Sequence, residues 1–122
     1  MEIIIDGIVY VPKQEDAKVK VELVVLEEHY KFEIHPKELG EMTWEEAKKA
    51  CKQLGKGWRL PTRVELLLMY KNKNIIGGFA SDYYWSSTEI DLYDAGIQNF
   101  NYGLQNHSNK YYSYYVRAVK TI

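Results

Sequence analysis

Residues 57–70 read GWRLPTRVELLLMY, and this stretch decides the fold that the sequence predicts. Thr62 and Glu65 form a capping box, in which the hydroxyl accepts from a free N–H of the first turn and the carboxylate reaches back to the cap amide. Pro61 precedes the cap, and the apolar run VELLLMY follows it. We therefore expect a helix that begins at Thr62 and ends before the turn-forming residues 72–74.

A second capping box occurs upstream, where Thr43 is followed three residues later by Glu46. Apolar residues then recur at helical spacing, at Trp44, Ala47, Ala50, Cys51 and Leu54. Gly55 follows at a position where a helix C-terminus favours a left-handed residue. These signals predict a helix over residues 43–54 with one buried face.

The first third of the chain has the composition of β-strands. Asp6-Gly7 separates two runs of β-branched residues, which predicts a hairpin. The polar stretch PKQEDAK, residues 12–18, is expected to be a solvated connector. Apolar and polar residues then alternate within residues 19–34, which predicts two strands with a break near Glu27-Glu28.

The last third, from Tyr83 onward, is aromatic and rich in turn residues. We expect strands near residues 83–87, 97–101 and 112–119. The order of strands, two helices and strands predicts an α+β domain. We divide the chain into an N-terminal β region, residues 1–38, and a main domain, residues 39–122.

Composition limits the function classes. A chain of 122 residues with 46 % hydrophobic content is expected to form one core. A net charge of −1 without a basic run argues against nucleic acid as a partner. No stretch approaches the roughly 18 apolar residues of a membrane span, and the N-terminus lacks the pattern of a secretion signal, so we expect no membrane insertion.

Residues that could carry catalysis or hold a metal are scattered. His29, His35 and His107 fit no zinc-binding spacing, and neither G-x-S-x-G nor a phosphate loop occurs. The single cysteine, Cys51, falls in a helical pattern and is expected to be a buried structural thiol rather than a nucleophile. We therefore expect no enzyme activity, no cofactor and no metal site. The three tryptophans adjoin structural signals, and we expect them in the core rather than in a stacking platform.

One segment departs from an ordinary protein surface. No formally charged residue occurs from Ala95 to Asn109, and Lys110 is alone before Arg117. Asn and Tyr dominate this segment. Tyr supplies contact area at low entropic cost, and Asn and Ser add adaptable hydrogen bonds, so this composition suits a binding surface.

Three blocks in a fixed order carry a family resemblance: GWRLPTRVELLLMY, YWSSTE at residues 84–89 and YYVRAV at residues 114–119. The chain resembles the C-type-lectin-like domains of bacterial and phage proteins, a group that includes sulfatase-modifying-factor-like and DUF1566-type families. The resemblance covers about residues 42–121. It implies two helices packed on short antiparallel β-sheets, with the N-terminal strands added. The residues that match this scaffold are Trp58, Leu60, Pro61, Trp85, Ser86, Ser87, Glu89, Phe100, Gly103, Val116, Arg117 and Val119.

Within this group the chain most resembles the variable proteins of diversity-generating retroelements. In those systems adenine-only copying errors turn Asn codons into a set of residues that excludes Lys, Gln, Glu, Met and Trp. Between Ile90 and Tyr115 the excluded types occur only at Gln98, Gln105 and Lys110. The motifs of calcium-dependent lectins and the catalytic cysteines of formylglycine-generating enzymes are both missing, so neither activity is carried over.

The resemblance implies a non-enzymatic protein that recognises a protein or cell-surface ligand through a diversified surface. Its setting would be phage or virus receptor binding or microbial surface display, and the N-terminal strands could join a larger virion or surface assembly. The alternative is an invariant structural or adhesin module of the same fold. Some of residues 111–114 should lie in a loop, with at least one tyrosine half-buried. The expected contact residues are Asp91, Tyr93, Asp94, Ile97, Asn99, Asn101, Tyr102, Leu104, Asn106, His107, Ser108, Asn109, Tyr111, Tyr112, Ser113 and Tyr114.

Overall fold

The computed structural model describes the backbone of residues 3–5, 8–15, 18–25 and 28–122, and the side chains from residue 31 onward. The helices are α1 (Trp44–Gln53), α2 (Arg63–Lys71) and α3 (Lys73–Ile76). The strands are β1 (Ile3–Ile5), β2 (Ile8–Glu15), β3 (Lys18–Val25), β4 (Glu28–Ile34), β5 (Glu41–Met42), β6 (Trp58–Arg59), β7 (Tyr83–Glu89), β8 (Asp94–Asn99), β9 (Gln105–Asn109), β10 (Tyr114–Tyr115) and β11 (Val119–Thr121). The chain is therefore an α+β protein, as the sequence predicts.

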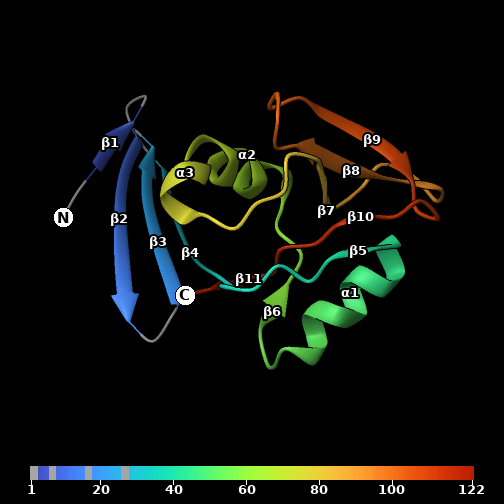
Figure 1. The fold of residues 1–122 in the computed structure, drawn as a ribbon, viewed down its shortest axis with the longest axis horizontal. Coiled ribbons are helices and arrows are strands. Elements are labelled where there is room, and N and C mark those ends of the chain that lie inside the picture. Colours follow the sequence, from blue (N-terminus) through green and yellow to red (C-terminus); the bar gives the residue numbers. More distant parts are fainter. Residues whose placement is uncertain (1–2, 6–7, 16–17, 26–27) are drawn as a thin grey trace.

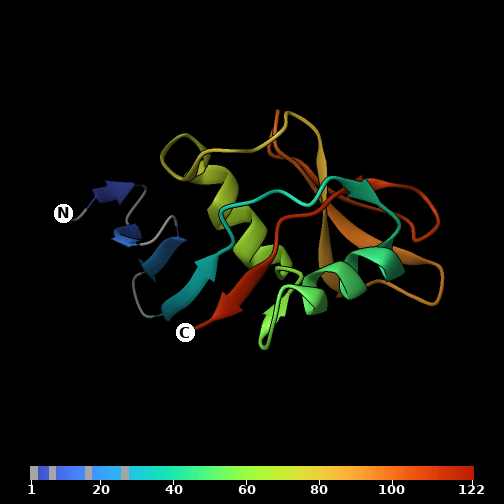
Figure 2. The same cartoon turned by 60° about the horizontal axis from the view of Figure 1, so that its bottom comes forward.

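The described strands form two sheets. Their orders are β1-β2-β3-β4-β11-β6 and β5-β10-β7-β8-β9. In Figure 1 the N-terminal strands lie at one end of the molecule and the five-stranded sheet at the other, with α2 and α3 between them. The C-terminal strand β11 runs beside β4, which the rotated view in Figure 2 makes plain.

Both predicted helices begin where their capping boxes place them. The Thr43 hydroxyl accepts from Glu46 N, and the Glu46 carboxylate accepts from Thr43 N at 3.0 Å. Thr62 and Glu65 repeat the arrangement, with 2.9 Å between Thr62 N and Glu65 Oε1. The capping boxes satisfy amides that the first turn of a helix leaves free, so they fix the start of each helix locally. The four-residue α3, which the sequence did not predict, follows directly after α2.

The N-terminal strands confirm one prediction and correct another. β1 and β2 pair antiparallel on either side of Asp6-Gly7, which lies outside the described residues. The predicted connector at 12–18 is wrong for residues 12–15 and for Lys18, because β2 continues to Glu15 and pairs throughout with β3, which begins at Lys18. Proline is tolerated there because β1 pairs only as far as Tyr10, so the outer side of β2 carries no described partner at Pro12. The break predicted near Glu27-Glu28 agrees with the boundary between β3 and β4, since β4 begins at Glu28; residue 27 lies outside the described residues.

The C-terminal strands differ more from the prediction. β7 lies where it was expected, β8 begins earlier, and β9 was not predicted. The single strand expected over 112–119 is wrong, because β10 and β11 belong to different sheets. β10 pairs with β5 and β7, whereas β11 pairs with β4 and β6, so residues 116–118 cross from one sheet to the other.

Among the described side chains, two apolar clusters fill the interior. The first brings together residues of α2, of α3 and of both sheets, and it contains Phe32, Ile34, Leu66, Leu68, Met69, Ile76, Tyr84, Phe100 and Val119. The second lies between α1 and the five-stranded sheet and contains Trp44, Ala47, Cys51, Trp58, Leu60, Trp85, Ala95, Ile97, Val116 and Ala118. The pairing of Ile34 with Val119 joins the last strand of the 1–38 region to the last strand of the main domain. The division at residue 38 stays a prediction.

Candidate functional site

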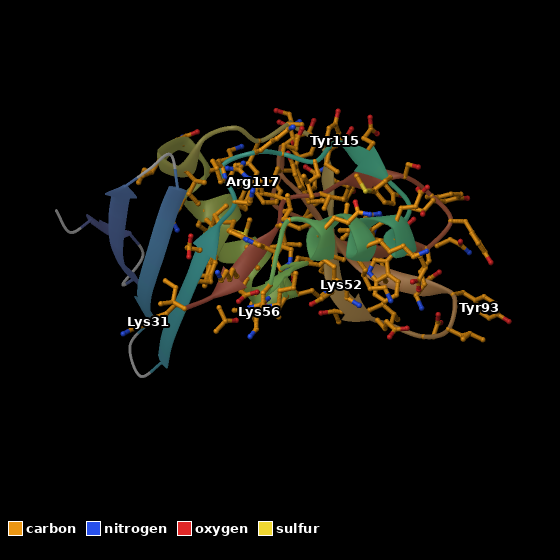
Figure 3. All side chains as sticks on the ribbon, turned by 90° about the horizontal axis from the view of Figure 1, so that it is seen from below. Lys31, Lys52, Lys56, Tyr93, Tyr115 and Arg117 are labelled. Atoms are coloured by element: carbon orange, nitrogen blue, oxygen red, sulfur yellow. The ribbon has the colours of Figure 1, made fainter. Side chains whose placement is uncertain are left out.

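The charge-poor segment lies within residues 91–114, and its strand β9 forms an outer edge of the five-stranded sheet. Residues 91–114 run from the turn after β7 through β8 and β9 to β10. Large apolar and aromatic side chains along it are between 62 and 85 % exposed, at Leu92, Tyr93, Tyr102, Leu104, Tyr111 and Tyr112. Figure 3 shows Tyr93 extending away from the ribbon at the end opposite the N-terminal strands.

The predicted contact residues divide by exposure. The exposed members are Asp91, Tyr93, Asn101, Tyr102, Leu104, Asn106, His107, Tyr111, Tyr112 and Ser113. The half-buried members are Asp94, Ser108, Asn109 and Tyr114. The expectation for residues 111–114 is therefore confirmed, since Tyr114 is half-buried in β10 and the preceding residues lie in a turn and loop.

Ile97 and Asn99 are buried and do not lie on the exposed surface. β8 is covered on both faces: Ile97 joins the α1 cluster, and Arg63 of α2 packs over Gly96, where a Cβ would lie 2.5 Å from Arg63 Nε. A strand buried on both faces exposes neither set of alternating side chains. The sequence alone did not reveal that β8 is an inner strand, because β9 was not predicted.

The large exposed apolar and aromatic side chains gather at two ends of one ladder. In the β8–β9 pairing Asp94 lies opposite Asn109 at one end, and Gln98 lies opposite Gln105 at the other. Leu92, Tyr93, Tyr111 and Tyr112 lie beyond the first end, and Tyr102 and Leu104 lie beyond the second. The structure therefore separates these large side chains into two groups, with the exposed polar residues Asn106 and His107 on β9 between them.

A groove lies at the first end. It has a volume of about 460 Å³ and is lined by Thr43, Glu45, Glu89, Leu92, Tyr93, Lys110 and Tyr111. We call it the Tyr93–Tyr111 groove. Its walls come from the turn after β7, the turn after β9 and the first turn of α1, three segments that are distant in the sequence.

Lys110 holds these three segments together. Its ammonium donates to Glu89 Oε2 at 2.7 Å and to the carbonyls of Asp91 and Leu92, both at 3.1 Å. The Lys110 backbone donates to Tyr93 O and accepts from Trp44 N, and its Nζ lies 4.7 Å from the centre of a Trp44 ring. The hydrogen bond from Lys110 also lowers the pKa of Glu89. Sequence reasoning noted Lys110 as an isolated charge but missed this role, which depends on contacts across the fold.

Several polar side chains of the segment stabilise its turns. Asp91 Oδ1 accepts from Tyr93 N and Asp94 N, each at 2.8 Å. These backbone hydrogen bonds lower the pKa of Asp91. Asn99 Oδ1 accepts from the next turn, from the amides of Asn101 and Tyr102. Such bonds from Asn and Asp to backbone two or three residues ahead are typical of tight turns.

The remaining polar contacts link neighbouring strands and turns. Asn109 Oδ1 accepts from Tyr111 N at 2.9 Å. Ser108 Oγ lies 2.8 Å from the hydroxyl of Tyr114, and His107 Nδ1 lies 2.9 Å from Asp94 Oδ2. The loops are thus held by their own side chains, and the exposed rings project from an ordered support.

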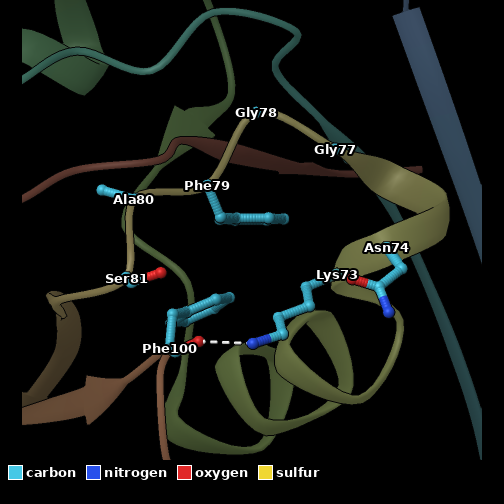
Figure 4. Close-up of a pocket in the computed structure, with 8 residues that line it drawn as sticks. All are labelled: Lys73, Asn74, Gly77, Gly78, Phe79, Ala80, Ser81 and Phe100. Atoms are coloured by element: carbon cyan, nitrogen blue, oxygen red, sulfur yellow. Dashed lines mark hydrogen bonds between the residues drawn. The ribbon is translucent and has the colours of Figure 1, made fainter.

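A second cavity lies between α3 and the chain that leads to β7, and Figure 4 shows it in close-up. It has a volume of about 320 Å³. Phe79 stacks on Phe100 with 4.6 Å between ring centres, and Lys73 Nζ donates to Phe100 O at 2.7 Å. Gly77 and Gly78 both have positive φ and form the connection after α3. The bond to Phe100 O uses one of the three donors of the Lys73 ammonium, which also lies 5.0 Å from the centre of the Tyr70 ring.

The predicted core residues lie where the sequence placed them. Trp44, Trp58 and Trp85 are buried, and the Trp44 and Trp85 indoles each donate to a backbone carbonyl at 2.9 Å. Cys51 is a buried free thiol, and burial raises its pKa to about 12. Among the side chains that the structure describes, no three His, Cys, Asp or Glu residues are grouped so as to hold a metal ion. Within the same part of the chain every helix is too short or too polar to span a membrane.

The chain matches a known protein family. The family model for the Lcl C-terminal domain matches residues 16–120, which extends the likeness into the strands before residue 38. A search of curated proteins found no match to this chain.

Proposed function

The chain belongs to the Lcl C-terminal domain family, a DUF1566-like family, and on that premise we propose that it is a non-enzymatic domain that binds a protein or cell-surface ligand. The observation that carries this proposal is the exposure of aromatic and apolar side chains on ordered loops of residues 91–114. Leaving such side chains in water forfeits the stabilisation that burial would give, so their clustering favours a surface that a partner covers.

The kind of side chain supports binding rather than catalysis. Tyrosine contributes a large ring with few rotatable bonds, so it loses little entropy when a partner immobilises it. The exposed loops carry few Lys and Glu side chains, whose ordering and desolvation weaken an interface. The one cysteine is buried with a raised pKa, which disfavours a nucleophilic role.

The finer fold assignment is also part of the proposal. We propose that the two capped helices and the curled sheets form a C-type-lectin-like domain, with residues 91–114 as its ligand-binding loops. The N-terminal strands would join it to a larger assembly on a virion or a microbial surface. The order of elements and the position of the exposed segment before the last strand support this assignment.

Diversification by a retroelement would act on exposed positions only. Within the described part of the chain the side chains of Tyr93, Tyr102, Tyr111 and Tyr112 could change without loss of a hydrogen bond, and all four are residue types that an altered Asn codon can encode. Sequencing of the encoding locus tests this part: adenine-linked codon variation at these positions beside a template repeat is expected, and uniform codons would refute it.

One observation favours the alternative of an invariant binding module. Asp91, Asn99 and Asn109 each accept backbone hydrogen bonds within the loops, so replacing them would weaken the loops that present the aromatic rings. An invariant module would show the same codons at these positions and at the exposed tyrosines in all copies of the locus.

The binding proposal is tested with purified surface proteins and intact cells. The fluorescently labelled domain should bind a subset of them, and the combined change of Tyr93, Tyr102, Tyr111 and Tyr112 to Ser should abolish binding. A control variant with Lys49, Lys52 and Lys56 changed to Ser alters exposed residues of α1 and the following turn and should bind normally. Equal binding by the tyrosine variant and the parent would refute the proposal.

A further inference from the structure

The Tyr93–Tyr111 groove has apolar and aromatic walls. Tyr93, Tyr111 and Leu92 line it, and these side chains are 66, 85 and 79 % exposed. Their loops are fixed by Asp91 and Asn109, which accept backbone hydrogen bonds within each turn. The groove therefore presents rings and an aliphatic side chain on a support that is already ordered before a ligand arrives.

Lys110 lines the groove, but its ammonium has no hydrogen-bond donor left for a ligand. Its ammonium has three donors, and three acceptors already take them: Glu89 Oε2, Asp91 O and Leu92 O. Only 13 % of its side chain is exposed. An anionic ligand would have to displace one of these bonds, so Lys110 does not make the groove a site for phosphate, sulfate or carboxylate.

Hydrogen-bonding capacity remains available at the groove on its two carboxylates, each of which has one lysine partner. Glu89 bonds Lys110 through Oε2 alone, so its Oε1 is free of that contact, and the side chain is 59 % exposed. Glu45 also lines the groove and pairs with Lys48, whose ammonium lies 3.2 Å away and also over the Trp44 ring. The hydrogen bond from Lys110 holds the Glu89 pKa below its ordinary value, so this carboxylate is ionised at neutral pH.

We propose that the Tyr93–Tyr111 groove binds a basic side chain, lysine or arginine, presented by a partner protein. The aliphatic stem would pack on Leu92 and the two tyrosine rings, and the cationic head would meet the carboxylates of Glu45 and Glu89. Aromatic faces attract cations, and this attraction adds to the ion pairs. The inference rests on the proposed function, since it names the chemistry of one part of the same surface.

The test uses small probes and backbone amide shifts of the isotope-labelled chain. N-acetyl-lysine methylamide and N-acetyl-arginine methylamide should shift the amides of Leu92, Tyr93 and Tyr111. The norleucine derivative has a similar stem without the charge and should bind about threefold or more weakly, as the loss of a cation–π contact predicts. The glutamate derivative should shift none of these amides. Equal binding of the lysine and norleucine derivatives, preferred binding of the glutamate derivative, or no shift with any probe would overturn the inference.

Variants test two contributions to binding. One comparison distinguishes the aromatic ring of Tyr111 from its apolar area, and the other distinguishes the Glu45 carboxylate from the overall charge of the protein. Tyr111→Phe should keep the affinity for the lysine probe, whereas Tyr111→Leu should lower it about threefold, because the leucine side chain has no π face. Glu45→Gln leaves the Lys110 contacts intact and should lower it about twofold. Asp82→Asn makes the same charge change at the opposite end of β7 and should have no effect. A neutral sugar that shifts the groove amides more strongly than the lysine probe would overturn the inference in favour of a glycan.

The outcomes also separate this inference from the proposed function. If the basic probes fail while the four-tyrosine variant still loses binding to cells and surface proteins, the inference fails and the proposed function stands. If the lysine probe occupies the groove while the four-tyrosine variant binds cells as the parent does, the proposed function fails.

Discussion

Arg117 lies across the ring of Phe79, with 4.6 Å between its Cζ and the ring centre, in a position where its side chain is only 2 % exposed. Its Nε donates to His35 O and its Nη1 to Gly77 O at 3.0 Å. These contacts tie the crossing between β10 and β11 to the chain after β4 and to the end of α3. Arg117, the second residue of the VRAV block, thus joins three segments that are distant in the sequence.

Replacing Arg117 should therefore destabilise the whole domain. Arg117→Met keeps much of the side-chain volume but leaves two carbonyl groups without their donor and removes the contact with Phe79. We expect a loss of about 3 kcal/mol in the free energy of unfolding, measured by urea denaturation. Lys56→Met, at an exposed position, should change it by less than about 0.5 kcal/mol. A loss at Arg117 as small as that of the control would show that the crossing does not depend on this side chain.

The pair formed by Glu65 and Arg59 should make stability depend on pH. Arg59 Nη1 and Nη2 donate to the two oxygens of the Glu65 carboxylate, at 2.7 and 2.9 Å. Burial alone would raise the Glu65 pKa, but the hydrogen bonds from Arg59 and Thr62 outweigh it, and the pKa is lowered. Because the folded pKa lies below the unfolded value of about 4.3, the pair stabilises the fold above that pH and loses its effect as the pH falls through the folded pKa.

Urea denaturation at a series of pH values measures this dependence. The difference in unfolding free energy between the parent and Glu65→Gln should be largest near neutral pH and should shrink below about pH 4. Arg59→Met should remove the same dependence, and the double variant should add little to either single change. Parallel stability curves for the parent and Glu65→Gln would contradict the assignment.

The accuracy of the sequence predictions follows the range of the interactions involved. The starts of α1 and α2 were predictable because Thr43 and Thr62 each bond to a residue three positions ahead. β9 was missed because its sequence QNHSN has no apolar alternation, and its pairing with β8 is its main support. The split between β10 and β11 depends on the two partner sheets, which no local pattern encodes.

The sequence identified the segment that forms the candidate site but not the arrangement of its residues in space. The charge gap identified the segment, and most of its large side chains are exposed. Ile97 and Asn99 were placed among the contact residues because the types of residue in a segment do not distinguish an inner strand from a loop. Lys110 was visible only as an isolated charge, since its partners on the β7 turn lie about 20 residues away.

Cys51 should be unreactive while the protein is folded. Its pKa of about 12 and its burial in the α1 cluster leave very little thiolate at ordinary pH. The thiolate fraction near pH 8 should be about a thousandfold below that of a free cysteine. Mass spectrometry after iodoacetamide treatment should therefore find labelling only when urea unfolds the chain. Rapid labelling of the folded protein would contradict a structural role and would reopen a nucleophilic one.

Asn99 and Asn101 provide a matched test of which asparagines build the loops and which are replaceable. Asn99 is buried, and its Oδ1 accepts from the amides of Asn101 and Tyr102 at 2.8 and 2.7 Å. Asn99→Ala should cost about 1–2 kcal/mol of unfolding free energy, because it leaves two amides of the turn without their acceptor. Asn101→Ala changes an exposed side chain of the same turn and should cost less than about 0.5 kcal/mol.

Asn99→Asp completes the comparison because it keeps an acceptor for both amides. It should retain more stability than Asn99→Ala in the same urea measurement, since the lost hydrogen bonds rather than the lost volume cause the destabilisation. The result bears directly on diversification: a position whose change weakens the turn cannot vary freely, whereas its exposed neighbour can. Equally small effects of Asn99→Ala and Asn101→Ala would remove this distinction and leave both asparagines open to replacement.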